Sequence, residues 1–410
     1  MNAPTIFLFI IGIILFNYAL ERVLQYLNNQ HRSEELPQEL SDLYPPEKYK
    51  KQQEYDSVKS RYGLITSTFS LLIMLGMLLF DGFAFVDTQV RAFSDNTIIQ
   101  ALLFFGSLSL ASDLISIPFS IYNTFIIEER FGFNRMTAKT FIMDKLKGYL
   151  MGGIIGGGLL TLFVWFYEST GDQFWVYGWV AFSGFMVLMT SFYATLIVPL
   201  FNKLTPLDQG DLRTAIETYC AKVGFKLDNL FVMDGSKRSS KGNAFFSGLG
   251  SSKRIVLFDT LIQKHTVKEL VAVLAHEVGH YKKKHTLTSI VLSIIQTGLM
   301  LFVLSLVINY PVLSEALGAG QHSFHLGLLV FTLLYGPLSM IMGIGMHVLS
   351  RKNEYQADAF ARDTYEGEAL GDALKKLSID TLSNLKPHPI YVFFYYSHPT
   401  LLQRLQALND

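Results

Sequence analysis

Seven long apolar segments constrain the fold more than any other feature of this sequence. Each can cross the hydrocarbon core of a bilayer, which takes about 20 residues of α-helix. Only 17% of the 410 residues are charged, whereas about 25% are charged in ordinary soluble domains. The sequence therefore predicts an all-α integral membrane protein with helices near 5–26, 63–86, 98–122, 149–168, 174–199, 287–309 and 325–350.

The basic residues are distributed unevenly between the segments that connect these helices. Residues 22–61, 123–148, 201–286 and 351–410 hold 33 of the 34 lysines and arginines, and Arg91 is the exception. Because positive charge is retained on the cytosolic side of membranes, we expect these four segments in the cytosol and the N-terminus outside. The formal net charge is zero, so nothing points to a nucleic-acid partner.

Four regions follow from this arrangement. Residues 1–200 hold the first five membrane helices with their cytosolic loops, 201–286 a small α+β cytosolic insert, 287–350 the last two membrane helices, and 351–410 a cytosolic C-terminal segment. The insert has an amphipathic helix near 209–223 and strand-like runs at 229–233, 243–247 and 254–258. The last two runs form a hairpin through 248–252, which would offer an edge strand to an extended peptide or serve a purely structural role.

The sequence His276-Glu277-Val278-Gly279-His280 is an H-E-x-x-H motif inside a predicted helix. Residues i and i+4 share one helix face, so the two imidazoles can bind one zinc ion and Glu277 can reach a water on that ion. A capping box at Thr266–Glu269 predicts the start of the helix. We expect this helix to continue without a break past Leu299. The alternative is a surface helix with two solvated histidines.

A catalytic zinc needs a third protein ligand and one open position. Glu354 is the best candidate because it lies at the cytosolic end of the last membrane helix. Asp358, one turn later, could accept the free N–H of a ligand histidine. A solvated charged helix end is the alternative explanation. His398 and His285 are rival ligands, but in a straight helix His285 would lie roughly 130° from the motif's face.

The expected chemistry is peptide hydrolysis. Zinc would lower the pKa of its water, and Glu277 would take the proton as the water attacks a carbonyl. The resulting oxyanion needs a hydrogen-bond donor besides the metal, for which His398 and Arg404 are the candidates.

Several blocks together resemble the type I CAAX prenyl proteases, which are integral-membrane zinc metalloproteases. The likeness covers nearly the whole chain and rests on 129–134 (Glu-Arg-Phe-Gly-Phe-Asn), 198–203, 243–246, 255–260, 274–282, 353–358 and 397–399. The resemblance implies seven helices around a chamber, one Zn²⁺ held by His276, His280 and Glu354, and Glu277 as the base. It also implies that His398 and Arg404 assist near the metal, and that a strand with Asn243, Ala244 and Phe245 holds the substrate backbone.

The same resemblance implies hydrolysis after a prenylated cysteine, with release of the C-terminal tripeptide. The expected partners are a peptide or protein substrate, with a prenylated C-terminus as one form, and membrane lipid. The short link 261–266 and the absence of an ER-return signal at the C-terminus indicate a bacterial member in the inner membrane. Two alternatives remain: a quality-control zinc protease acting on unprenylated substrates, and a transporter or receptor with a structural zinc.

Overall fold

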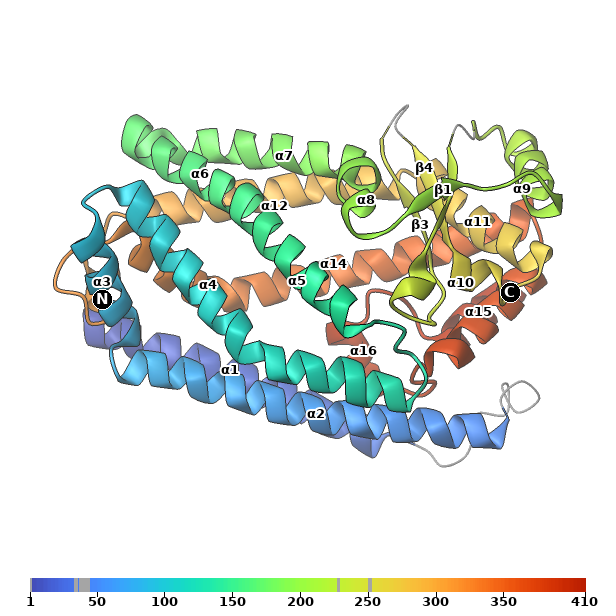
Figure 1. Ribbon diagram of the computed structural model, residues 1–410, viewed down its shortest axis with the longest axis horizontal. Coiled ribbons are helices and arrows are strands. Elements are labelled where there is room, and N and C mark those ends of the chain that lie inside the picture. The colour runs from blue at the N-terminus through green and yellow to red at the C-terminus, as the bar shows by residue number, and fades with distance from the viewer. Residues whose placement is uncertain (1, 33–35, 37–44, 227–228, 250–252) are drawn as a thin grey trace.

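Long helices run along the longest axis of the molecule (Figure 1). The computed structural model describes residues 2–32, 36, 45–226, 229–249 and 253–410. Within this part of the chain, six helical stretches are long and apolar enough to cross a membrane. They are Ala3–Gln30 (α1), Pro46–Leu79 (α2), Thr97–Glu128 (α4 and the π-helical η2), Ala138–Phe201 (α5 to α8), His285–Val307 (α12) and Phe324–Thr364 (α14).

The fourth stretch contains two of the seven predicted segments. A 3₁₀ turn at Gly171–Gln173 (η4) interrupts it, and the helices on either side pack against each other. The parts are α5 (Ala138–Met151), η3 (Gly152–Gly156, π-helical), α6 (Gly157–Thr170), α7 (Phe174–Leu196) and α8 (Val198–Phe201). The all-α membrane architecture is thus confirmed, whereas seven separate passages and an enclosed chamber stay predictions.

One predicted segment, 63–86, has different bounds in the structure. Helix α2 begins at Pro46 and ends at Leu79, and Asp81 adopts a left-handed conformation with φ of 53°. A separate helix, α3 (Gly82–Phe93), follows. Its Phe83 and Val90 are buried in a cluster with residues of α1, α4 and α14. Phe83 and Val90 therefore serve packing at one end of the bundle.

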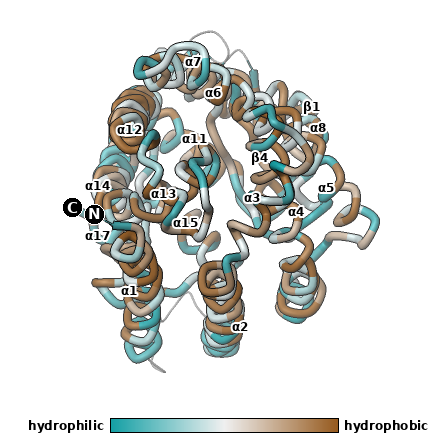
Figure 2. The backbone as a smooth tube through the Cα atoms, turned by 90° about the vertical axis from the view of Figure 1, so that its left-hand side faces the viewer, coloured by the Kyte–Doolittle hydropathy of each residue, from teal (hydrophilic) through white to brown (hydrophobic). Residues whose placement is uncertain are grey.

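Apolar side chains cover much of the outer surface of the long helices. Leu8, Leu72 and Phe80 are 68%, 62% and 84% exposed. Figure 2 shows hydrophobic residues along the helices, which stand in a ring when viewed from the end that carries α3. Soluble monomers rarely expose large contiguous apolar surfaces. The chain is a multi-pass membrane protein, and these exposed apolar side chains form its lipid-facing surface.

The insert contains a four-stranded sheet of strand order β1-β2-β4-β3. Strands β2 and β4 are parallel, and the other pairs are antiparallel. The hairpin and the edge position of β3 are as predicted, β1 was not predicted, and residues 250–252 of the connecting turn lie outside the described residues. The elements are β1 (Leu204–Pro206), α9 (Asp211–Lys222), β2 (Leu230–Met233), η5 (Gly235–Lys237), β3 (Ala244–Ser247), β4 (Arg254–Phe258) and α10 (Asp259–Ile262).

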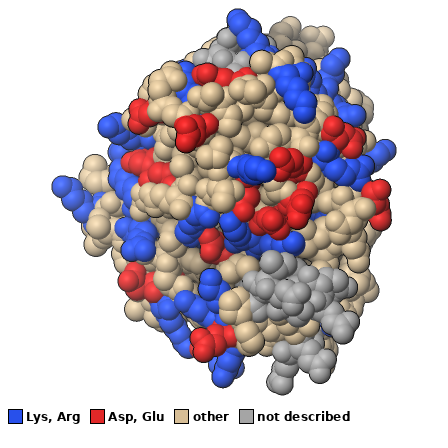
Figure 3. All heavy atoms as spheres, turned by 90° about the vertical axis from the view of Figure 1, so that its right-hand side faces the viewer, with Lys and Arg blue, Asp and Glu red and all other residues tan. Residues whose placement is uncertain are grey.

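Helix α11 (Val267–Lys282) is the centre of the insert's core. The predicted capping box is present, with Thr266 Oγ1 accepting from Glu269 N and Glu269 Oε2 from Thr266 N. Residues 269–276 are buried in succession, so the helix is covered on all sides. Helices α9, α14 and α15 (Gly367–Thr381) lie around α11. The remaining helices are α13 (Val312–Glu315), α16 (Pro389–Tyr395) and α17 (Leu401–Asn409). Figure 3 shows charged side chains of both signs on this end of the molecule.

The expected continuous helix from Thr266 past Leu299 is wrong. Helix α11 ends at Lys282, Lys284 adopts a left-handed conformation with φ of 60°, and α12 starts at His285. A left-handed residue other than glycine costs roughly 1–2 kcal/mol. Packing of α11 in the insert and of α12 against α7 offsets that cost. The break gives the two helices separate directions.

Candidate metal centre

Three side chains from two helices meet at one point. His276 and His280 lie on α11 and Glu354 on α14, and one potential ligand atom from each lies within 4.8 Å of the others. Glu354 Oε2 is 3.4 Å from His276 Nε2, and Glu354 Oε1 is 3.3 Å from His280 Nε2. Among the described residues this is the one such group of histidine, cysteine and acidic side chains. The structure thus brings the three predicted ligands together.

Gly279 permits the two helices to approach this closely. A Cβ atom at position 279 would lie 3.1 Å from Ala357 Cα and 3.2 Å from the Ala357 carbonyl oxygen. Those distances are tighter than ordinary van der Waals contact, and the atoms belong to the α14 backbone. A larger residue at position 279 would therefore separate the histidines from Glu354.

The second nitrogen of each histidine has a partner that fixes its orientation. His276 Nδ1–H donates to Asp358 Oδ1 (2.8 Å), which confirms the placement predicted for Asp358. Arg404 donates from Nε and Nη2 to the same carboxylate, at 2.8 Å and 2.6 Å. Asp358 is buried, 1% exposed, so an unpaired charge there would be costly and Arg404 compensates it.

His280 has an uncharged partner. Its Nδ1 lies 3.0 Å from His285 Nδ1, and His285 Nε2 lies 2.9 Å from Gln356 Oε1. An amide oxygen only accepts, so His285 carries its proton on Nε2 and accepts from His280 through Nδ1. His285 therefore orients His280 as Asp358 orients His276.

This arrangement suits a metal cation. Once His276 has lost its second proton, the protons of His276 and His280 are on Nδ1, and their Nε2 atoms, 3.1 Å apart beside the Glu354 carboxylate, can both donate a lone pair to one cation. Glu354 Oε2 is buried and has no hydrogen-bond partner among the described residues. Two imidazoles and one carboxylate are a set found in catalytic zinc sites. The donor set therefore fits zinc.

Two groups of α11 have perturbed acidity. Burial lowers the pKa of His276, but the nearby carboxylates of Asp358 and Glu354 outweigh it, and the pKa rises to about 9. Burial raises the pKa of Glu277, and the nearby His276 and His280 partly offset that rise. A carboxylate with a raised pKa is a better proton acceptor than an ordinary glutamate.

His398 and Arg404 occupy different positions around the centre. His398 Nε2 is 3.4 Å from Glu354 Oε1, and its side chain is 62% exposed. The protein around the ring removes part of its hydration, and this partial desolvation lowers the pKa of His398. Arg404 is buried, its Nη1 is 3.5 Å from Glu354 Oε2, and the rest of its guanidinium binds Asp358. His398 thus faces the open side of the centre, and Arg404 lies behind the ligands.

Strand β3 presents an unpaired edge. The Asn243 carbonyl accepts from Phe258 N (3.0 Å), so Asn243 and Phe245 direct their backbone groups to β4. Because these groups alternate, Ala244 and Phe246 direct theirs to the free edge. Asn243 Oδ1 accepts from Ala244 N (2.9 Å). A cavity of about 330 Å³ adjoins the end of this strand, lined by residues of α7, by 246–248 and by Thr286.

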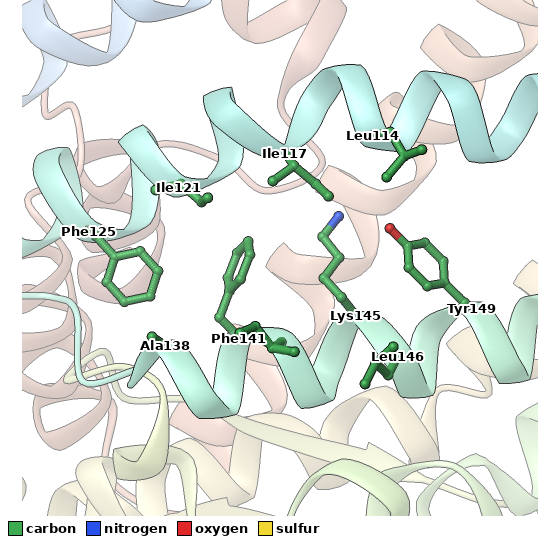
Figure 4. A pocket seen from close by; sticks show the side chains of 10 residues that line it. Leu114, Ile117, Ile121, Phe125, Ala138, Phe141, Lys145, Leu146 and Tyr149 are labelled. Atoms are coloured by element: carbon green, nitrogen blue, oxygen red, sulfur yellow. The ribbon is translucent and has the colours of Figure 1, made fainter.

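A second cavity lies in the membrane part, away from the metal centre. It has a volume of about 440 Å³ and separates α4 from α5 (Figure 4). Ile117 and Ile121 of α4 and Phe125 of η2 face Phe141 of α5 across it. The Lys145 ammonium also projects toward α4, where it binds Asp113 (2.6 Å). Such an apolar surface is compatible with a hydrocarbon chain.

Sequence reasoning missed the roles of His285 and Gln356. A straight helix would point His285 away from the motif, but the break at Lys284 turns it toward His280. The run Lys282-Lys283-Lys284 favours a helix end, since basic residues are common in the last turn of a helix, but it does not indicate the left-handed conformation of Lys284. Gln356, two residues after Glu354, had no signal of its own.

Known proteins resemble the chain along its whole length. Residues 25–203 match the family described as "CAAX prenyl protease N-terminal, five membrane helices", and residues 206–410 match "Peptidase family M48". The "Probable CAAX prenyl protease 1" of Schizosaccharomyces pombe is 38% identical over 92% of this chain and 82% of its own. The human "CAAX prenyl protease 1 homolog" is 32% identical over 91% and 88%. The crystal structure of Saccharomyces mikatae Ste24p superposes with a TM-score of 0.93 at 35% identity, covering both chains completely.

Proposed function

The chain belongs to peptidase family M48 and is a metallopeptidase, and on that premise we propose that it cleaves the peptide bond after a prenylated cysteine. The released product would be the C-terminal tripeptide. The observation that carries the proposal is the convergence of His276, His280 and Glu354, with Glu277 next to His276 in the sequence. Glu354 lies on α14, a helix long and apolar enough to cross a membrane. The curated relatives are CAAX prenyl proteases by name and match over nearly the whole chain.

His276, His280 and Glu354 would hold one zinc ion. A zinc ion there supplies a Lewis acid for the scissile carbonyl and lowers the pKa of a nearby water. Glu277 follows His276 on the same helix and takes the proton of the attacking water. It then delivers that proton to the leaving amine. Its raised pKa suits both roles.

The residues around the ligands have separate tasks in this proposal. His398, exposed on the open side of the centre, would donate a hydrogen bond to the oxyanion of the tetrahedral intermediate. The Arg404 guanidinium is occupied by Asp358, so we assign it to holding Asp358 and hence His276. Arg404 is thus required for the reaction through its effect on His276.

The substrate peptide would lie extended along β3. The free edge offers the Ala244 carbonyl and the backbone groups of Phe246, while Ala244 N–H donates to the Asn243 side chain. Asn243 and Phe245 lie on either side of Ala244. Pairing through the backbone requires few particular side chains, so selectivity for the residues after the cysteine would be loose.

The charge distribution supports the proposed placement in the cell. With 33 of 34 basic residues in four segments, the metal centre and C-terminus would face the cytosol and the N-terminus the outside. The bacterial inner membrane remains our prediction for the membrane concerned, and the relatives named above, which are fungal and human, do not test it.

The direct test is cleavage of a farnesylated Cys-a-a-X peptide by the purified full-length protein in detergent. We expect release of the tripeptide, loss of activity with a chelator and recovery with zinc. Glu277→Gln should bind zinc as the wild type does and lose nearly all turnover, because the ligands stay while the base is gone. An active Glu277→Gln protein, or cleavage at another bond, would contradict the proposal.

A further inference from the structure

The segment Glu128 to Asn134 has an unusual mixture of charged and aromatic residues that the reaction leaves unexplained. Glu128 is the last residue of the π-helical turn η2 (Asn123–Glu128), which continues α4. Short π-helical turns within helices are frequent at functional sites. The chain then reverses at Gly132, whose φ of +82° favours glycine. This segment, which we call the 128–134 loop, leads from η2 toward α5 and contacts the insert.

Glu128 binds a lysine of the insert. Its carboxylate accepts from Tyr55 Oη (2.7 Å) and Lys59 Nζ (3.3 Å) on α2, and from Lys241 Nζ (3.1 Å). The Lys241 ammonium also lies 4.1 Å from the centre of the Phe133 ring and 5.3 Å from that of Tyr55. Lys241 Nζ also donates to Tyr55 Oη (3.2 Å). Lys241 is therefore held by a carboxylate, a phenolic hydroxyl and aromatic rings.

The backbone on both sides of this contact is paired. Ser240 N donates to Phe133 O (3.0 Å), Arg135 N donates to Arg238 O (3.0 Å), and Ser240 Oγ donates to Gly132 O (2.9 Å). The 128–134 loop thus lies along 238–240 much as a short strand would. The aromatic side chains of Phe131 and Phe133 are buried below it, 4% and 5% exposed.

Lys241 is close in sequence to the edge strand. Its carbonyl accepts from Thr260 Oγ1 (3.0 Å), and β3 begins three residues later at Ala244. A Cβ on the intervening Gly242 would lie 3.2 Å from Leu261 Cα, so this link has little freedom to shift. Strand β3 itself contacts α11, the helix that carries His276 and His280.

We propose that the Glu128–Lys241 pair is a clamp that fixes β3 relative to the metal centre, which makes the two residues positioning residues for the substrate peptide. This inference rests on the proposed function, in which β3 binds the substrate backbone. The clamp joins α2 and η2 of the membrane part to the segment that leads into the strand that the peptide pairs with. Loosening it should weaken peptide binding and leave the metal ligands in place.

The first test uses hydrogen–deuterium exchange on the full-length zinc-loaded protein in detergent. In Lys241→Met, amides of 239–247 should exchange at least about tenfold faster, while those of α11 stay unchanged. Lys241→Arg keeps the charge and should behave nearly as the wild type. Arg130→Ala is the matched control, because it removes an exposed ion pair to Glu54 from the same loop. Unchanged exchange in Lys241→Met, or equal acceleration in Arg130→Ala, would overturn the clamp.

The second test separates positioning from simple destabilisation. Lys241→Met and Glu128→Gln should raise KM by about tenfold with a smaller change in kcat, because peptide binding contributes to ground and transition states alike. Partial unfolding would instead lower the apparent kcat and leave KM unchanged. An unchanged KM would therefore overturn the positioning role.

An error in the proposed substrate can be distinguished from an error in the proposed clamp. It would appear as a wild-type protein that cleaves an unprenylated peptide and no prenylated one. The KM comparison then uses that unprenylated peptide, and hydrogen exchange requires no substrate at all.

Discussion

His280 Nδ1 lies 3.0 Å from His285 Nδ1, although the two residues belong to different helices. A ligand histidine commonly donates its second N–H to a group that orients the ring. Here that group is a neutral imidazole, whose own proton is donated to Gln356 on α14. The hydrogen bonds between His280, His285 and Gln356 thus connect α14 and the start of α12 with the metal centre.

Replacing His285 should weaken metal binding. His285→Ala leaves His280 without its acceptor, and loss of such partners typically lowers metal affinity by about 10–100-fold. Zinc affinity measured by competition with a chromophoric chelator checks this. Thr288→Ala is the matched control, since Thr288 donates its side-chain hydrogen bond only to Lys284 O (3.2 Å) near the start of the same helix. Equal affinities for His285→Ala and wild type would contradict the orienting role.

The sequence predicted the ligands better than their surroundings. His276 and His280 follow from helical spacing, and Glu354 and Asp358 from one turn of another helix. Their meeting depends on contact between α11 and α14, which Gly279 permits. The left-handed Lys284 could not be anticipated, because local preference disfavours that conformation and tertiary packing imposes it. The role of His285 depends on that one residue.

In the membrane part, too, some features follow from the sequence pattern and others depend on tertiary packing. Apolar length located every long helix, but it could not separate residues that face lipid from those that pack inside the bundle. Phe83 and Val90 are buried, so α3 packs on the bundle. The predicted helix at 63–86 is therefore interrupted after Leu79, and a second helix begins at Gly82. Strand β1 was missed because it has only three residues, one of them Pro206.

Metal affinity should depend on pH through His276. Its pKa is raised to about 9, whereas an ordinary histidine has a pKa of about 6.5. Below pH 9 the metal-free protein therefore holds a proton that a metal ion must displace. Apparent zinc affinity should fall by up to about tenfold for each pH unit below 9. Chelator competition over this range measures the slope, and a flat profile would show that His276 is unprotonated before the metal binds.

The single cysteine should be unreactive in the folded protein. Cys220 is 1% exposed, and burial raises the pKa of its thiol to about 12. The thiolate that maleimides and iodoacetamide require is then scarce at pH 8. Because the folded pKa is raised, burial of the thiol stabilises the fold fully below the unfolded pKa of about 8.5, and that contribution is lost as pH rises toward 12. We expect labelling only as denaturant unfolds the insert, and rapid labelling of the native protein would contradict this.

Because Cys220 is expected to be unreactive, the natural sequence is a suitable background for mapping membrane topology with single introduced cysteines. Asp95 and Gly320 are exposed between helices at one end, and Lys237 and Asp363 are exposed on the insert and C-terminal side. Single cysteines at the first two positions should react with an impermeant thiol reagent on intact cells or right-side-out vesicles. Those at Lys237 and Asp363 should react only after permeabilisation. The reverse pattern would place the metal centre outside.

The last prediction concerns the contribution of the lipid on the substrate. Burial of a hydrocarbon chain stabilises a complex by about 0.8 kcal/mol per CH₂ group, so burial of even a few groups gives about 3 kcal/mol, or roughly 100-fold in affinity. The apolar surfaces of the membrane helices, including the cavity between α4 and α5, offer places for such a chain. Lipid bound equally in the ground and transition states lowers KM and leaves kcat nearly unchanged.

Removing the farnesyl group should therefore raise KM by about 10–100-fold with kcat within about threefold. A peptide with a geranyl group, which is shorter, should give an intermediate KM. Steady-state kinetics in detergent, with peptide below its aggregation concentration, makes the comparison. Equal kcat/KM for the peptide with and without its lipid would rule out a lipid-binding contribution. The metallopeptidase itself would be unaffected by that outcome, and unprenylated membrane proteins would become its expected substrates.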